Sequence, residues 1–129
     1  MMPKILIVED EEPNVEILSR LLVMNKFDVV IAGNKKDALE LATNEEIDLV
    51  LMDIGIPDAE GEEFNKDGGL EAARWLKSNS RTAMIPVIAT SASAMLDEKQ
   101  RFLEAGCDDV QSKPFDFPAL MESIRNQLD

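Results

Sequence analysis

The stretch that decides the fold is KILIVED, residues 4–10, in which a short apolar run leads directly into two carboxylates. Two further apolar runs also end in polar groups: DLVLMD at residues 48–53 ends in Asp53, and VIATS at residues 87–91 ends in Thr90 and Ser91. Buried parallel strands are continuous apolar runs, and in open α/β sheets the functional crevice lies beyond the carboxyl ends of the strands. The sequence therefore predicts a parallel sheet with an acidic site at one edge.

The segments between the apolar runs have the spacing of amphipathic helices. We predict strands at residues 4–8, 28–32, 48–53, 84–90 and 107–112. A helix is expected after each strand, with apolar stripes that include Leu18, Ala38, Leu70, Phe102 and Leu120. Because parallel neighbours need a crossover, this alternation predicts an α/β fold with helices on both faces of the sheet. We expect one domain over residues 1–129, without an output domain.

Composition excludes several classes of chemistry. The chain of 129 residues has no histidine, which rules out Ser-His-Asp and Cys-His nucleophilic sites and HExxH metallohydrolases. The single cysteine, Cys107, has no internal partner for a disulfide, and this favours a reducing compartment. Any chemistry must therefore use carboxylates, lysine, hydroxyl groups or the backbone.

The charge balance argues against two classes of partner. Lys and Arg total 13 against 26 Asp and Glu, a formal net charge of −13, which disfavours binding to nucleic acid or to an anionic membrane. The apolar run near the N-terminus is too short for a signal peptide or a membrane span. We expect a cytoplasmic protein.

The strand ends are expected to bring Glu9, Asp10 and Asp53 into one pocket. Three carboxylates in close quarters repel one another unless a cation neutralises them. Oxygen ligands completed by water suit Mg²⁺. Ser91 and Lys113, which follow later strands, would add a hydroxyl donor and a positive charge. This set of groups fits phosphoryl transfer to a carboxylate.

Four segments in this order resemble the receiver domain of two-component response regulators, over essentially the whole chain. They are residues 5–10, residues 48–53 with Pro57, residues 86–92 and residues 105–115. The resemblance implies the flavodoxin-like doubly wound sheet of five strands in the order 2-1-3-4-5, flanked by five helices. It also implies a cis peptide bond before Pro114.

The resemblance assigns a role to each candidate residue. Asp53 would accept a phosphoryl group from a histidine kinase or a histidine phosphotransfer protein. Glu9, Asp10, Asp53 and the backbone carbonyl of Gly55 would hold Mg²⁺. Ser91 would bond a phosphoryl oxygen, and Lys113 would pair with the aspartyl phosphate.

The function implied is that of a stand-alone switch. Phosphorylation would change its binding to a downstream protein that the sequence does not identify. Such a receiver catalyses only its own phosphorylation and dephosphorylation, so it is not an enzyme in the usual sense. It would be a monomer or a phosphorylation-dependent dimer.

Two features depart from the family. The loop after Pro57 is about eight residues longer than usual, and its inserted part, residues 58–67, is acidic. The insertion could gate the pocket, contact a partner or only lengthen a solvated loop. Val110 stands where receivers commonly carry an aromatic ring that swings inward. The switch would then depend on Ser91 and the helix that follows it, or Val110 is simply an apolar residue of a short strand.

Two small residues, Gly55 and Ser93, flank the expected phosphoryl group. Because they leave a hydrolytic water unhindered, we expect a short-lived phosphoryl state.

Three other functions fit parts of the sequence. A Mg²⁺-dependent aspartyl-phosphate phosphohydrolase also uses an aspartate at a strand end, but it commonly has a second acid where this chain has Gly55. A flavodoxin-like cofactor binder is disfavoured because the acidic residues 9–12 would repel the phosphate of FMN. A degenerate receiver that binds its partner constitutively is disfavoured by the complete set of acidic residues with Ser91 and Lys113.

Overall fold

The computed structural model describes residues 2–92 and 95–129 and contains one parallel sheet in the order β2-β1-β3-β4-β5. The strands are β1 (Lys4–Val8), β2 (Asp28–Ala32), β3 (Leu49–Asp53), β4 (Val87–Ser91) and β5 (Asp109–Ser112). The helices are α1 (Glu12–Met24), α2 (Lys35–Asn44), α3 (Gly68–Ser78), α4 (Leu96–Glu104) and α5 (Phe117–Leu128). The predicted fold class and strand order are confirmed.

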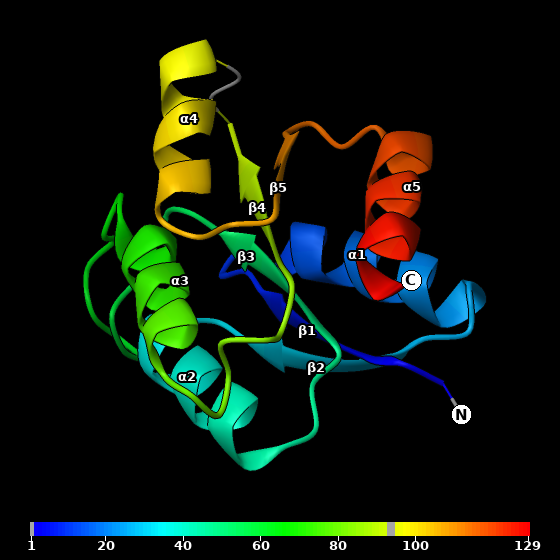
Figure 1. Cartoon of the computed structure of the whole chain (residues 1–129), viewed down its shortest axis with the longest axis horizontal. Coiled ribbons are helices and arrows are strands. Elements are labelled where there is room, and N and C mark those ends of the chain that lie inside the picture. The colour runs from blue at the N-terminus through cyan, green and yellow to red at the C-terminus, as the bar shows by residue number, and fades with distance from the viewer. Residues whose placement is uncertain (1, 93–94) are drawn as a thin grey trace.

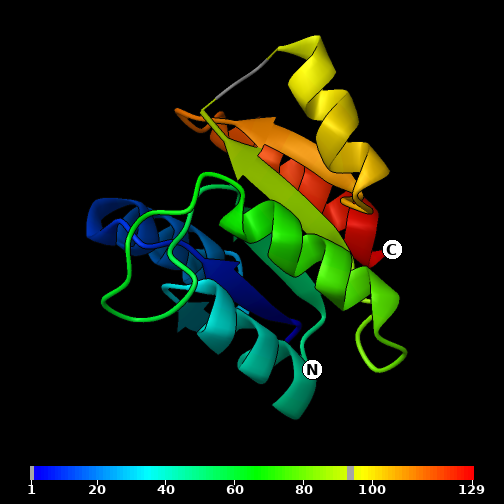
Figure 2. The ribbon, with the colours of Figure 1, turned by 90° about the vertical axis from the view of Figure 1, so that its left-hand side faces the viewer.

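Successive residues of each central strand enter two different cores, one on each face of the sheet. Figures 1 and 2 show α1 and α5 on one face and α2, α3 and α4 on the other. Ile5 and Ile7 pack with α1 and α5, whereas Leu6 and Val8 pack with the helices of the opposite face. Both faces of the strand are therefore buried, which explains the continuous apolar runs.

Two strands begin two or more residues after their predicted starts, while the start of β3 and the end of β4 differ from the prediction by one residue each. β4 begins at Val87, not at Met84, and the Met84 side chain is 91% exposed. Pro86 lacks an N–H group, and the sheet begins where its carbonyl accepts a bond from the Val50 N–H. β5 begins at Asp109 because the N–H of Cys107 still donates to Phe102 at the end of α4.

Two loops have special backbone conformations, and the second of them was predicted. Gly106 has a φ of 105° and lies just beyond the end of α4, the left-handed position at which glycine commonly follows a helix. The peptide bond between Lys113 and Pro114 is cis. In residues 2–92 and 95–129, no helix combines the length and apolar character needed to cross a membrane.

The start of α3 lies against the backbone at the end of β3. The Gly69 N–H donates to the Ile54 carbonyl at 2.7 Å. A Cβ atom on Gly69 would lie 1.9 Å from the Asp53 carbonyl oxygen, and one on Gly68 would lie 2.3 Å from the Ile56 carbonyl oxygen. Only glycine therefore allows α3 to approach this closely to the strand that ends in Asp53.

We predict that Gly69→Ala lowers the free energy of unfolding by about 3 kcal/mol, because the new methyl group must displace backbone. Gly33→Ala is the matched control, since the nearest atom to its Cβ would be 3.9 Å away. Urea denaturation of both variants measures the difference. Equal stability of the two variants would contradict the close approach of α3 to β3.

Candidate functional site

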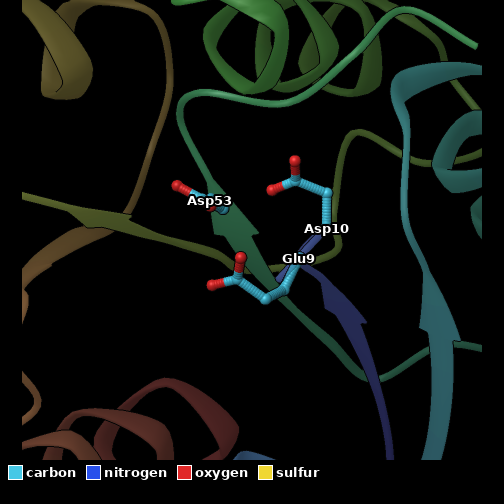
Figure 3. A group of neighbouring side chains, drawn as sticks. All are labelled: Glu9, Asp10 and Asp53. Atoms are coloured by element: carbon cyan, nitrogen blue, oxygen red, sulfur yellow. The ribbon is translucent and has the colours of Figure 1, made fainter. Parts of the chain in front are cut away.

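Three carboxylates meet at the carboxyl edge of the sheet. Glu9 and Asp10 follow β1, Asp53 ends β3, and Val8 is paired with Met52 in the strands that carry them. Figure 3 shows the three side chains around a common space. Each offers an oxygen atom that lies within 4.8 Å of the others. Glu9 and Asp53 are buried and Asp10 is exposed, so the predicted convergence is confirmed.

Lys113 supplies positive charge to this cluster. Its Nζ atom donates to Glu9 Oε1 at 2.8 Å and to Asp53 Oδ2 at 3.0 Å. The second oxygen of Glu9 accepts a bond from the Glu11 backbone N–H at 3.1 Å. The lysine side chain is 18% exposed, so its ion pairs are shielded from water. Lys113 therefore pairs with two carboxylates at the ends of different strands, Glu9 just after β1 and Asp53 at the end of β3.

One lysine does not neutralise the charge of three carboxylates. Burial, and then the charge of Glu9, raise the pKa of Asp53 to about 7, although Lys113 acts in the opposite direction. Burial also raises the pKa of Asp10. For Lys113, burial alone would lower the pKa, but the bond to Glu9 and the charge of Asp53 outweigh it and raise the pKa. Oxygen ligands with excess negative charge fit a hard divalent cation such as Mg²⁺.

A pocket of about 450 Å³ lies beside Asp53, and its lining includes Gly55, Ser91 and Lys113. Ser91 is the last residue of β4, and its carbonyl accepts a bond from the Lys113 N–H at 2.8 Å. The Gly55 N–H donates a hydrogen bond to Asp53 Oδ1, with 3.4 Å between the nitrogen and the oxygen. The structure thus brings the predicted serine, lysine and glycine to one pocket with Asp53. Ser93, the other small residue considered above, lies outside the described residues.

Val110 lies in the core and not in the pocket. It is paired with Ala89 in the sheet and belongs to the buried cluster that contains Phe102 of α4. This placement favours the packing role over a part in the site.

The insertion contributes residues to the site that the sequence did not indicate. Phe64, Lys66 and Asp67 line the same pocket as Asp53. Asp67 forms an ion pair with Arg101 of α4 at 3.0 Å. The one sequence signal for these contacts was the single aromatic residue, Phe64, within an acidic loop. The ion pair of Asp67 could not be predicted, because Arg101 lies far along the chain.

The beginning of the insertion, at Asp58, is also anchored. Asp58 and Glu71 both accept from Lys35 Nζ, at 3.1 Å and 3.0 Å. The hydrogen bonds from Asn65 and then from Lys35 lower the pKa of Asp58. The inserted segment is therefore joined to α2 and α3, which disfavours the view that it only lengthens a solvated loop.

The chain belongs to the response regulator receiver domain family, whose sequence pattern matches residues 5–125. Members of this family are phosphorylation-controlled signalling switches of two-component systems. The chain is 36% identical over 128 residues to the polar-differentiation response regulator DivK of Brucella anthropi, and the match covers 98% of each chain.

Solved structures of receivers have the same fold. A CheY-like receiver domain protein from Methanospirillum hungatei is 26% identical, with a TM-score of 0.85 over 100% of this chain and 95% of that one. The receiver domain of the sensor histidine kinase PA1611 from Pseudomonas aeruginosa is 24% identical, with a TM-score of 0.85 over 99% and 98% of the two chains. In that protein a magnesium ion is coordinated in the active-site cleft.

We predict that Lys113→Met lowers the free energy of unfolding by about 3 kcal/mol in EDTA, because two shielded carboxylates lose their shared cation. Lys4→Met is the matched control: its ion pair with Glu45 is about one third exposed on both sides, and its loss should cost less than about 1 kcal/mol. Urea denaturation measures both values. A loss for Lys113→Met as small as that of the control would contradict the ion pairs described here.

Proposed function

We propose that Asp53 is the phosphoryl acceptor of this receiver and that a histidine kinase or a histidine phosphotransfer protein is the donor. The support is the position of Asp53, whose carboxylate lies beside a pocket lined by Ser91 and Lys113. An Asp53 oxygen would form a bond to phosphorus. The bond between phosphorus and the donor nitrogen would break, with its electron pair remaining on the imidazole, which then takes up a proton.

Mg²⁺ is the cation that we propose for the carboxylate cluster. Asp10 and Asp53 would hold it together with the charge of Glu9 and the backbone carbonyl of Gly55. When bound, Mg²⁺ supplies positive charge to the carboxylates and to an oxygen of the phosphoryl group. The excess negative charge of the cluster supports this assignment, and so does the magnesium ion in the cleft of the Pseudomonas receiver.

Lys113 and Ser91 would hold the transferred group. Lys113 Nζ already lies 3.0 Å from Asp53 Oδ2, so it can pair with a phosphoryl group attached to that carboxylate. The Ser91 hydroxyl would donate to a second phosphoryl oxygen. Because the Ser91 carbonyl is bonded to the Lys113 N–H, movement of Ser91 is coupled to the segment that carries Lys113.

The signal would leave the site through the end of β4 and through α4. Val110 provides no ring that could swing inward, and it is packed in the core. Movement of Ser91 would therefore be transmitted to α4, and the exposed surface of α4 would change its binding to a downstream protein. The match to DivK over nearly the full length of both chains supports a switch of this kind.

We predict that Mg²⁺ with acetyl phosphate adds one phosphoryl group to the wild-type chain and that Asp53→Asn prevents the addition. Intact-protein mass spectrometry measures the label. Asp48→Asn is the control, because Asp48 lies just before the first residue of β3, at the other end of the strand from Asp53. There its side chain accepts a hydrogen bond from the Lys4 N–H. Equal labelling of the Asp53→Asn variant would place the acceptor elsewhere.

We also predict that Mg²⁺ raises the melting temperature of the wild-type chain, because a ligand bound only to the folded state stabilises it by about 2.7 kcal/mol at a hundred times its Kd. Asp10→Asn should need a much higher Mg²⁺ concentration for the same shift. Glu12→Gln is the control, since this exposed carboxylate lies outside the cluster. A Mg²⁺ titration of all three proteins by differential scanning fluorimetry tests this. Identical curves for wild type and Asp10→Asn would contradict the site.

A further inference from the structure

The ring of Phe64, which belongs to the insertion, lies directly against Gly55. A Cβ atom on Gly55 would lie 2.5 Å from Phe64 Cζ and 2.7 Å from Cε1. Gly55 is two residues after Asp53, and its N–H lies 3.4 Å from Asp53 Oδ1. The ring therefore fills the space that a side chain at position 55 would occupy, next to the carboxylate of Asp53.

Apolar burial does not explain this position of the ring. Phe64 is 66% exposed and lies on the loop that Figure 2 shows extending away from the sheet between β3 and α3. The backbone of the next residue holds it in place. Asn65 donates to Ile56 at 3.3 Å and accepts from it at 3.1 Å, and its side chain donates to Asp58 at 2.8 Å. The fold thus holds an aromatic ring at the pocket although most of its apolar surface stays in contact with water.

We infer that Phe64 shields the phosphoryl group on Asp53 from attacking water and so sets the lifetime of the phosphorylated state. This inference rests on the proposed function of Asp53. Phe64 lines the same pocket as Asp53, Ser91 and Lys113. Its ring lies against Gly55, whose N–H donates to Asp53 Oδ1. The ring covers the pocket on the Gly55 side and excludes water there, which protects a hydrolysable intermediate.

The reaction that the ring slows is hydrolysis of the acyl phosphate. The oxygen of water forms a bond to phosphorus, and the bond between phosphorus and the Asp53 oxygen breaks. The electron pair of that bond remains on Asp53 and restores its carboxylate. Both protons of the water leave with the phosphate as dihydrogen phosphate, which releases one of them to solvent at neutral pH.

In the sequence, the small residues Gly55 and Ser93 predict an unhindered water and a short-lived phosphoryl group. In the structure the insertion supplies a bulky side chain to the same place. The lifetime is therefore governed by a residue of the insertion, one of the two features that depart from the usual receiver pattern.

The test is the decay of the phosphoryl group after removal of acetyl phosphate, in Mg²⁺, followed by intact-protein mass spectrometry. Phe64→Ala should accelerate the decay by about fivefold, because it opens the pocket to water. Phe64→Leu should lie between Phe64→Ala and wild type. Met84→Ala is the control for truncation of an exposed apolar side chain, since Met84 is 91% exposed and lies before β4, and its decay should match wild type.

A second variant separates shielding from a general loosening of the loop. Gly55 does not have a left-handed φ, so its backbone accepts a side chain once the ring is removed. Adding Gly55→Met to Phe64→Ala should slow the decay again toward the wild-type rate. A loosened loop would not be repaired by a side chain at position 55.

The outcomes distinguish this inference from the proposed function. If wild type takes no label, or if Asp53→Asn takes it equally, the proposed function fails and the inference fails with it. If Asp53 is labelled but Phe64→Ala decays at the wild-type rate, only the shielding role is overturned. Faster decay in Phe64→Ala that Gly55→Met does not slow would likewise overturn it.

Discussion

The structure depends on an excess of negative charge held at one edge of the sheet. Glu9, Asp10 and Asp53 offer oxygens within 4.8 Å of one another, and Lys113 contacts only Glu9 and Asp53 among them. Burial and the charge of Glu9 raise the pKa of Asp53 to about 7, which shows that ionisation of this carboxylate is costly in the absence of a further cation. This excess of negative charge supports the divalent cation that we propose for the site, and that cation would also neutralise the negative charge of a transferred phosphoryl group.

The backbone of the sheet maintains that arrangement. β1 and β3 are neighbours with Val8 opposite Met52, so the carboxylates that follow them emerge side by side. The two cores on either side of the sheet hold these strands in register. Gly68 and Gly69 let α3 begin directly against the end of β3, and this close approach holds the backbone that carries Asp53. The chemistry of the site and the packing of the sheet are therefore set by the same few residues.

The insertion joins the pocket to three helices. Lys35 of α2 holds its beginning through Asp58. Glu71 of α3 and Arg101 of α4 hold its end through Asn65 and Asp67. The segment therefore contacts both the acceptor pocket and α4, through which we propose that the signal leaves. A change at the acceptor could be communicated to α4 along the insertion as well as through Ser91.

The sequence by itself determined the sheet, the order of its elements and the principal residues of the site. Continuous apolar runs mark buried parallel strands, and because such strands end at a common edge, Glu9, Asp10 and Asp53 could be brought together without coordinates. The tertiary structure alone decided the start of β4, the burial of Val110 and the contacts of the insertion. The physical reason is that these features depend on partners distant along the chain. The position of the Phe64 ring against Gly55 and the pairing of Asp67 with Arg101 have no periodicity, so no local pattern of residues specifies them.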